Sequence, residues 1–76
     1  MRDHVVFHVL PGRDGWDVTK EGRRSRIAGY ASREEATERA RRELLAYPTG
    51  LLRVHDQDLA VREEFTAEAL AGTPPR

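Results

Sequence analysis

The densest cluster of residues that could do chemistry is a group of arginines in one short polar segment. Arg23, Arg24 and Arg26 follow a reversal at Gly22, and Tyr30 lies four residues beyond the last of them. Guanidinium groups bind phosphate oxygens well, and an aromatic ring can stack on a base. These four residues are the candidate nucleic-acid-binding site. The plainer interpretation is a solvated hairpin tip whose charges discourage pairing of the strand edges.

The three histidines are the main candidates for a metal site, because the chain contains no cysteine. His4 and His8 are four residues apart and would share one face of a strand, whereas His55 is distant in sequence. A structural zinc site needs four ligands, and only Asp56 or Asp58 could add to the histidines. We therefore predict no metal site and no cofactor, and interpret His8 as a partly buried strand residue.

No combination of residues predicts an enzyme. Ser25 has no catalytic motif around it, and Ser32 is explained as a helix cap. Glu63 and Glu64 are adjacent in a predicted strand, so their carboxylates would point to opposite faces. The glycines of segment 11–15 lack the spacing of a phosphate-binding loop. We expect a protein without catalytic residues.

Composition narrows the remaining classes. A chain of 76 residues, 38% hydrophobic and 34% charged, suffices for one domain with a thin core and leaves little room for a deep pocket. Thirteen basic residues balance thirteen acidic ones, which argues against strong nucleic-acid binding. The apolar run at residues 5–7 is too short for a signal peptide or a membrane span. With no cysteine present, we expect a cytoplasmic protein that does not associate with membranes.

The elements that must position these residues follow from hydrophobic periodicity and turn signals. A helix is predicted from Ser32, whose spacing to Glu35 fits a capping box, up to the breakers at 48–50. Strands are predicted on both sides of this helix, at residues 5–10, 16–21, 26–31, 51–55 and 59–65. The expected fold is α+β in the order β-β-β-α-β-β: a three-stranded antiparallel meander, one amphipathic helix packed on it, and a C-terminal hairpin that turns at residues 56–58. The domain spans residues 1–66, and residues 67–76 are predicted to be a disordered tail.

The alternating and helical apolar positions define the expected core, which consists of Trp16, Val18, Ala36, Ala40 and Leu44. Trp16 is its predicted anchor beneath the helix, so its loss should largely unfold the domain.

Four further apolar residues lie outside the core positions: Val6, Leu10, Leu45 and Leu51. Because so small a domain leaves part of its sheet uncovered, we predict a homodimer that buries some of these four residues.

Several short motifs occur in a fixed order between residues 4 and 66. They are HVLP at 8–11, GWxV at 15–18, Lys20 with Gly22, SxxEAxxRAR at 32–41 and Val54-His55. In this order they resemble a bacterial family of unknown function, domain of unknown function twenty-one eighty-eight. The chain has Asp56-Gln57-Asp58 in its last turn, where that family often has glycine. The resemblance supports the fold and implies no activity.

Together these observations favour a small non-enzymatic binding or assembly module. Its partner is another protein or a second copy of the chain. The alternative is a domain that binds nucleic acid weakly and with little sequence preference through the arginine segment.

Overall fold

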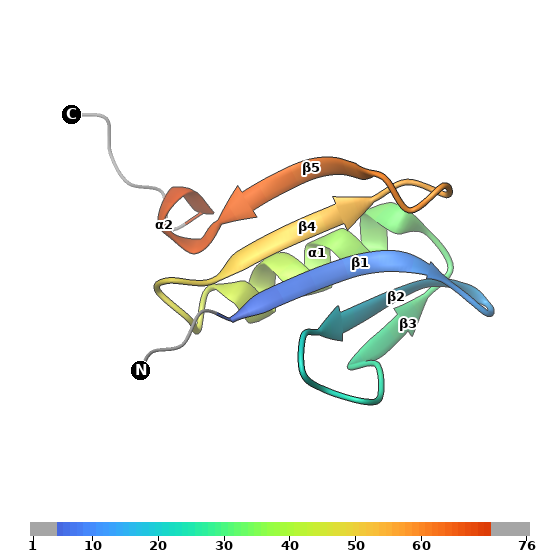
Figure 1. The fold of residues 1–76 in the computed structure, drawn as a ribbon, viewed down its shortest axis with the longest axis horizontal. Coiled ribbons are helices and arrows are strands. Elements are labelled where there is room, and N and C mark those ends of the chain that lie inside the picture. Colours follow the sequence, from blue (N-terminus) through green and yellow to red (C-terminus); the bar gives the residue numbers. More distant parts are fainter. Residues whose placement is uncertain (1–4, 71–76) are drawn as a thin grey trace.

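The computed structural model describes residues 5–70, which form one five-stranded sheet with a helix across one face (Figure 1). This confirms the α+β class and the predicted order of strands and helix. The elements in chain order are β1 (Val6–Gly12), β2 (Gly15–Lys20), β3 (Ala28–Tyr30), α1 (Arg33–Leu44), β4 (Leu51–His55), β5 (Val61–Thr66) and α2 (Ala67–Leu70).

The strand order across the sheet is β3-β2-β1-β4-β5. The first three strands form the predicted antiparallel meander, and β1 lies at the centre of the sheet. Strand β4 runs parallel to β1, with Val6 beside Leu51 and Val9 beside Val54, and β5 returns antiparallel to β4. The C-terminal hairpin therefore extends the sheet of its own chain, and it does so through a parallel pair.

Helix α1 begins at the predicted cap. The Ser32 hydroxyl accepts a hydrogen bond from the Glu35 backbone N–H at 3.1 Å, which satisfies one of the unpaired donors of the first turn. Glu34 and Glu35 lie at the positive end of the helix dipole, and Arg41 and Arg42 lie at the negative end. Local sequence alone thus accounts for where this helix starts.

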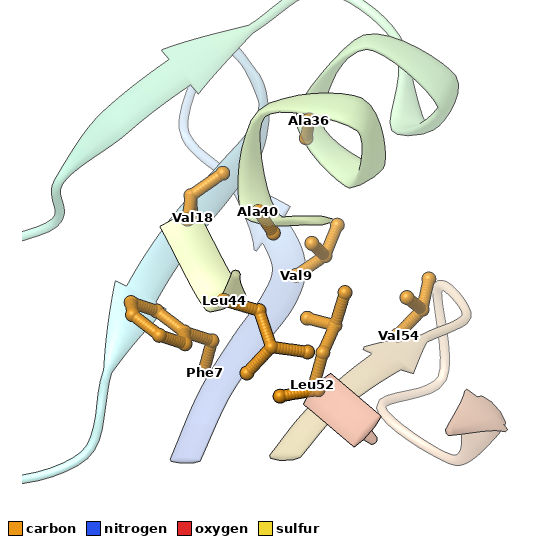
Figure 2. Close-up of a cluster of buried hydrophobic side chains, with 9 residues drawn as sticks. Phe7, Val9, Val18, Ala36, Ala40, Leu44, Leu52 and Val54 are labelled. Carbon is orange, nitrogen blue, oxygen red and sulfur yellow. The ribbon is translucent and has the colours of Figure 1, made fainter. Parts of the chain in front are cut away.

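The core lies between α1 and the sheet face that it covers. Figure 2 shows Ala36, Ala40 and Leu44 of the helix directed at side chains from the three central strands. The strand residues, all at most 1% exposed, are Phe7, Val9, Val18, Leu52 and Val54. Alanines at positions 36 and 40 let the helix approach the sheet closely. Four of the five predicted core residues are confirmed as fully buried.

Trp16 is the exception, because it is only partly buried and packs against the edge of the core. It lies beside Pro11 and Tyr30 near one end of the sheet, and the guanidinium of Arg33 covers its ring at 5.7 Å. The prediction that Trp16 anchors the core was wrong, because Trp16 contacts the core without being fully buried in it. Phe7 and Leu44 are the largest fully buried side chains instead.

Two predicted strands are shorter in the structure. Strand β3 covers only Ala28–Tyr30, and β5 begins at Val61. Leu59, placed in a strand by its alternation with Val61, has a φ of 70° and lies in the turn. Alternation cannot reveal this backbone reversal, because the sequence has a bulky leucine where glycine would be the usual signal.

The end of the described chain extends beyond the predicted domain boundary at residue 66. Residues 67–70 form α2, and Ala67, 4% exposed, belongs to the core. The N–H of Ala67 donates to the carbonyl of Gly50 at 3.1 Å, which ties α2 to the start of β4. The remainder of the predicted tail, residues 71–76, lies outside the described residues.

Candidate functional site

The face of the sheet opposite α1 is a broad surface available for binding. No other element between residues 5 and 70 covers it, and Figure 1 shows α1 on one side of the sheet only. We call this surface the open face. The residues that alternate with the buried ones on β1, β2 and β4 define it, namely Val6, His8, Leu10, Asp17, Thr19, Leu51, Arg53 and His55.

An apolar strip runs along the centre of the open face. Val6 and Leu51 are register partners on the adjacent parallel strands β1 and β4, and Leu10 lies further along β1. All three are partly buried by their neighbours on the sheet. Leu45, which was predicted to join them, is 53% exposed near the C-terminal end of α1. The apolar residues left outside the core therefore form a strip of three and a separate leucine.

Two histidines lie side by side within this strip, because His8 separates Val6 from Leu10 on the same face of β1. His8 of β1 and His55 of β4 have ring centroids 5.1 Å apart, and His8 Nδ1 is 2.9 Å from His55 Nε2. The parallel pairing of β1 with β4 creates the contact, because it sets His8 beside Arg53, two residues before His55. From sequence, His55 had been judged too distant to act with His8. The signal that was missing is the register of two strands 47 residues apart.

Each histidine also has a partner for its other ring nitrogen. His8 Nε2 lies 2.9 Å from the Glu21 carboxylate, and His55 Nδ1 lies 3.0 Å from the backbone carbonyl oxygen of Leu59. The result is a continuous chain of polar contacts from the end of β2 to the β4–β5 turn. Side chains of Asp, Glu, His or Cys do not gather in groups of three or more suited to a metal ion anywhere in residues 5–70.

The predicted arginine site is divided by the fold. Arg26 forms an ion pair with Asp17 at 2.8 Å, and this hydrogen bond together with the charge of Asp17 raises the pKa of Arg26 above its usual value. Its guanidinium lies over Gly29, where a β-carbon would collide with it. The ion pair therefore holds the Arg26 side chain against the open face.

Tyr30 lies on the other face of the sheet, so it cannot add a stacking surface to the arginines. Its ring packs against the core, and its hydroxyl accepts a hydrogen bond from Arg39 of α1 at 3.1 Å. Hydrogen bonds to Tyr30 and Glu43 raise the pKa of Arg39 above its usual value. The candidate site therefore does not come together: Arg26 and Tyr30 lie on opposite faces, because β3 starts only at Ala28 and the preceding chain bends.

Arg23, Arg24 and Arg26 are all exposed, but only Arg26 is held in an ion pair. Neither Arg23 nor Arg24 forms an ion pair with any other residue in the described part of the chain. Of the four predicted residues, only two adjacent arginines, at the tip of the β2–β3 connection, are both exposed and without an ion pair within residues 5–70.

A shallow groove of about 560 Å³ lies at the start of α1, between Trp16 and the β4–β5 turn. Arginine and carboxylate side chains line it together, including Arg33, Arg62 and Asp58. Mixed charge of this kind selects neither an anion nor a cation. No helix within residues 5–70 has the length and apolar character needed to cross a bilayer.

Comparison with known proteins identifies the family but adds no function. No curated protein and no solved structure matches the sequence. Residues 7–67 match a family described as an uncharacterized protein conserved in bacteria, DUF2188, and the match covers α1 and all of the sheet except Val6. The chain therefore belongs to the DUF2188 family, as the order of its short motifs suggested.

Proposed function

We propose that this protein is a small non-enzymatic assembly module of the bacterial cytoplasm that associates with a second copy of itself through the open face. The observation that carries the proposal is the contrast between this uncovered face and the protected edges of the same sheet. A standard interface buries about 800 Å² on each partner. That is roughly a sixth of the 5123 Å² surface, so only a whole face can supply it.

Both edges of the sheet resist pairing with another strand. At one edge, β3 has only three residues. At the other, Glu63 and Glu64 bring charge to β5, and a bulge interrupts its pairing with β4 between Val54 and His55. Short strands, charges and bulges are the devices by which natural sheets avoid edge-to-edge association. Association through the open face is consistent with this protection.

Charge favours a second copy as the partner. The chain has no net charge, so two copies do not repel each other. Ion pairs lie on either side of the apolar strip, Arg26 with Asp17 and Arg53 with Glu64, so the charges of the open face are largely neutralised within the face itself. Such a surface suits a neutral partner with an apolar centre and a polar rim, which another open face provides.

The test replaces one apolar residue of the open face and one elsewhere. Leu10→Lys places a charge in the apolar strip, whereas Leu45→Lys places it on the far side of the molecule as the matched control. We expect sedimentation equilibrium to show dimers for the unaltered protein and for Leu45→Lys, and monomers for Leu10→Lys.

Two results would contradict the proposal. One is a monomeric mass for the unaltered protein at high micromolar concentration. The other is a Leu10→Lys variant that folds and still dimerises. Should Leu10→Lys fail to fold, Val61→Lys provides the second test, because Val61 lies beside His55 in the sheet register and is already 48% exposed.

Nucleic-acid binding is the alternative, and the exposure of Arg23 and Arg24 is what favours it. Two phosphate contacts would give a logarithmic salt dependence of only about −2. Fluorescence anisotropy with labelled DNA at low salt tests this alternative. Binding lost in the Arg23→Ala/Arg24→Ala double variant would support it, and no binding by the intact protein would dispose of it.

A further inference from the structure

We infer that His8 and His55 form a binding site on the open face for one divalent transition-metal ion that prefers imidazole ligands, such as Zn²⁺, Ni²⁺ or Cu²⁺. Both ligands belong to one chain, so the site needs no second copy, although it lies on the face that the proposed self-association would cover. The inference rests on how the four ring nitrogens are partnered.

The outer nitrogen of each ring faces a group that can only accept a hydrogen bond. For His8 Nε2 this group is the Glu21 carboxylate at 2.9 Å, and for His55 Nδ1 it is the Leu59 carbonyl oxygen at 3.0 Å. An ionised carboxylate and a backbone carbonyl have no proton to give. Both outer nitrogens must therefore carry the hydrogen, which assigns the tautomer of each ring from the contact network.

This assignment leaves the inner nitrogens of the two neutral rings as acceptors. His8 Nδ1 and His55 Nε2 face each other at 2.9 Å, each with a lone pair directed into the same space. Two lone pairs at this distance repel unless a cation lies between them. The cation is either a third proton shared by the two rings or a metal ion.

The surroundings of the pair match those of metal-binding histidines. Such histidines almost always donate their second N–H to a carboxylate or a backbone carbonyl, which fixes the ring orientation and raises the basicity of the metal-binding nitrogen. Glu21 and Leu59 supply one partner of each kind. Leu59 is also the single non-glycine residue with positive φ among residues 5–70, at 70°. Backbone strain of this kind is often found at functional sites.

The distance between the inner nitrogens also fits a metal ion. An ion held 2.0–2.1 Å from each nitrogen in tetrahedral geometry separates them by about 3.3 Å, roughly 0.4 Å more than the spacing in the structure. The two rings must rotate to supply this difference, and in square-planar geometry the required spacing is about 2.9 Å. Because the chain supplies two ligands, the remaining positions stay open to water or to another ligand.

The experiment is a titration of the untagged protein with Zn²⁺ and Ni²⁺ by isothermal calorimetry at neutral pH. We expect one ion per chain, and no binding of Mg²⁺ or Ca²⁺, which prefer oxygen ligands. His8→Gln and His55→Gln should each abolish binding. Glu21→Gln should weaken binding about tenfold through the orientation of His8. His4→Gln is the matched control and should bind as the unaltered protein does.

A measurement on the unaltered protein keeps the inference testable even if the variants do not fold. Zn²⁺ should shift the imidazole ¹⁵N resonances of His8 Nδ1 and His55 Nε2 more than any others. The inference is overturned if the protein binds neither ion, which leaves a shared proton as the occupant of the pair. It is equally overturned if the resonances that shift belong to His4, or if both glutamine variants fold and retain the affinity.

Discussion

The two faces of the sheet differ in what their side chains do. On the face beneath α1, every fully buried side chain is apolar, and no polar side chain is buried anywhere in residues 5–70. On the open face, the same strands carry two ion pairs, a histidine pair and a strip of three half-buried apolar residues. One face therefore accounts for most of the stability, and the other retains groups that contribute little to folding. Binding functions are best sought on the second.

The largest expected effect tests the covered face. Phe7→Ala removes a ring that is 1% exposed and contacts Tyr47 at a centroid distance of 5.7 Å, so it should cost about 3–5 kcal/mol in the free energy of unfolding. Leu10→Ala, three residues along the same strand but on the open face, should cost about 1 kcal/mol. Urea denaturation of the two variants measures the difference. Equal losses of unfolding free energy would show that the open face contributes as much to stability as the covered face.

Trp16→Ala tests where the covered face ends. Because Trp16 is partly buried at the edge of the core, its truncation should cost about 2 kcal/mol, less than that of Phe7. Thermal unfolding followed by far-UV circular dichroism gives the comparison, since the variant lacks the tryptophan signal. A loss as large as that of Phe7→Ala would restore Trp16 as the anchor that the sequence suggested.

Ser32→Ala should have a smaller effect, confined to α1. It removes the hydroxyl that caps the helix and should lower stability by about 1 kcal/mol. Because the cap lies on the helix side of the sheet, the ¹⁵N resonances of the His8 and His55 rings should remain where they are in the unaltered protein. Movement of those resonances would show that the two faces are coupled.

The smallest expected effect has the opposite sign and lies beside the histidine pair. Leu59→Gly should raise stability by about 1 kcal/mol, because glycine adopts positive φ without strain and Leu59 is 60% exposed. Leu59→Ala is the control, since it removes the side chain but keeps the strain, and it should bring no gain. A loss of stability in the glycine variant would show that the leucine side chain makes a stabilising contact.

Much of the candidate site could not be read from local patterns. The Arg26 guanidinium lies over Gly29 and pairs with Asp17, and no local pattern in the sequence indicates this contact. Alternation along the predicted strand at 26–31 would place Tyr30 on the face of Arg26, but alternation holds only within a strand and β3 is three residues long. The sequence therefore could not show which residues of this segment are held by contacts elsewhere in the fold.

The features that could be predicted from local sequence are those set by neighbours along the chain. The start of α1 at Ser32, the buried stripe of Ala36, Ala40 and Leu44, and the alternation of Phe7 and Val9 all depend on residues within a few positions of one another. Such patterns fix helix, strand and buried face, because side-chain direction repeats with the period of each element.

The pairing of strands that are distant in sequence is visible only in the folded structure. The parallel pairing of β1 with β4 brings His8 to His55 across 47 residues and places Val6 beside Leu51, and it leaves one face of the sheet uncovered. No local period encodes this register. It arises because α1 must cross the sheet to bury its apolar stripe, and the chain then returns beside β1, where Leu52 and Val54 complete the core.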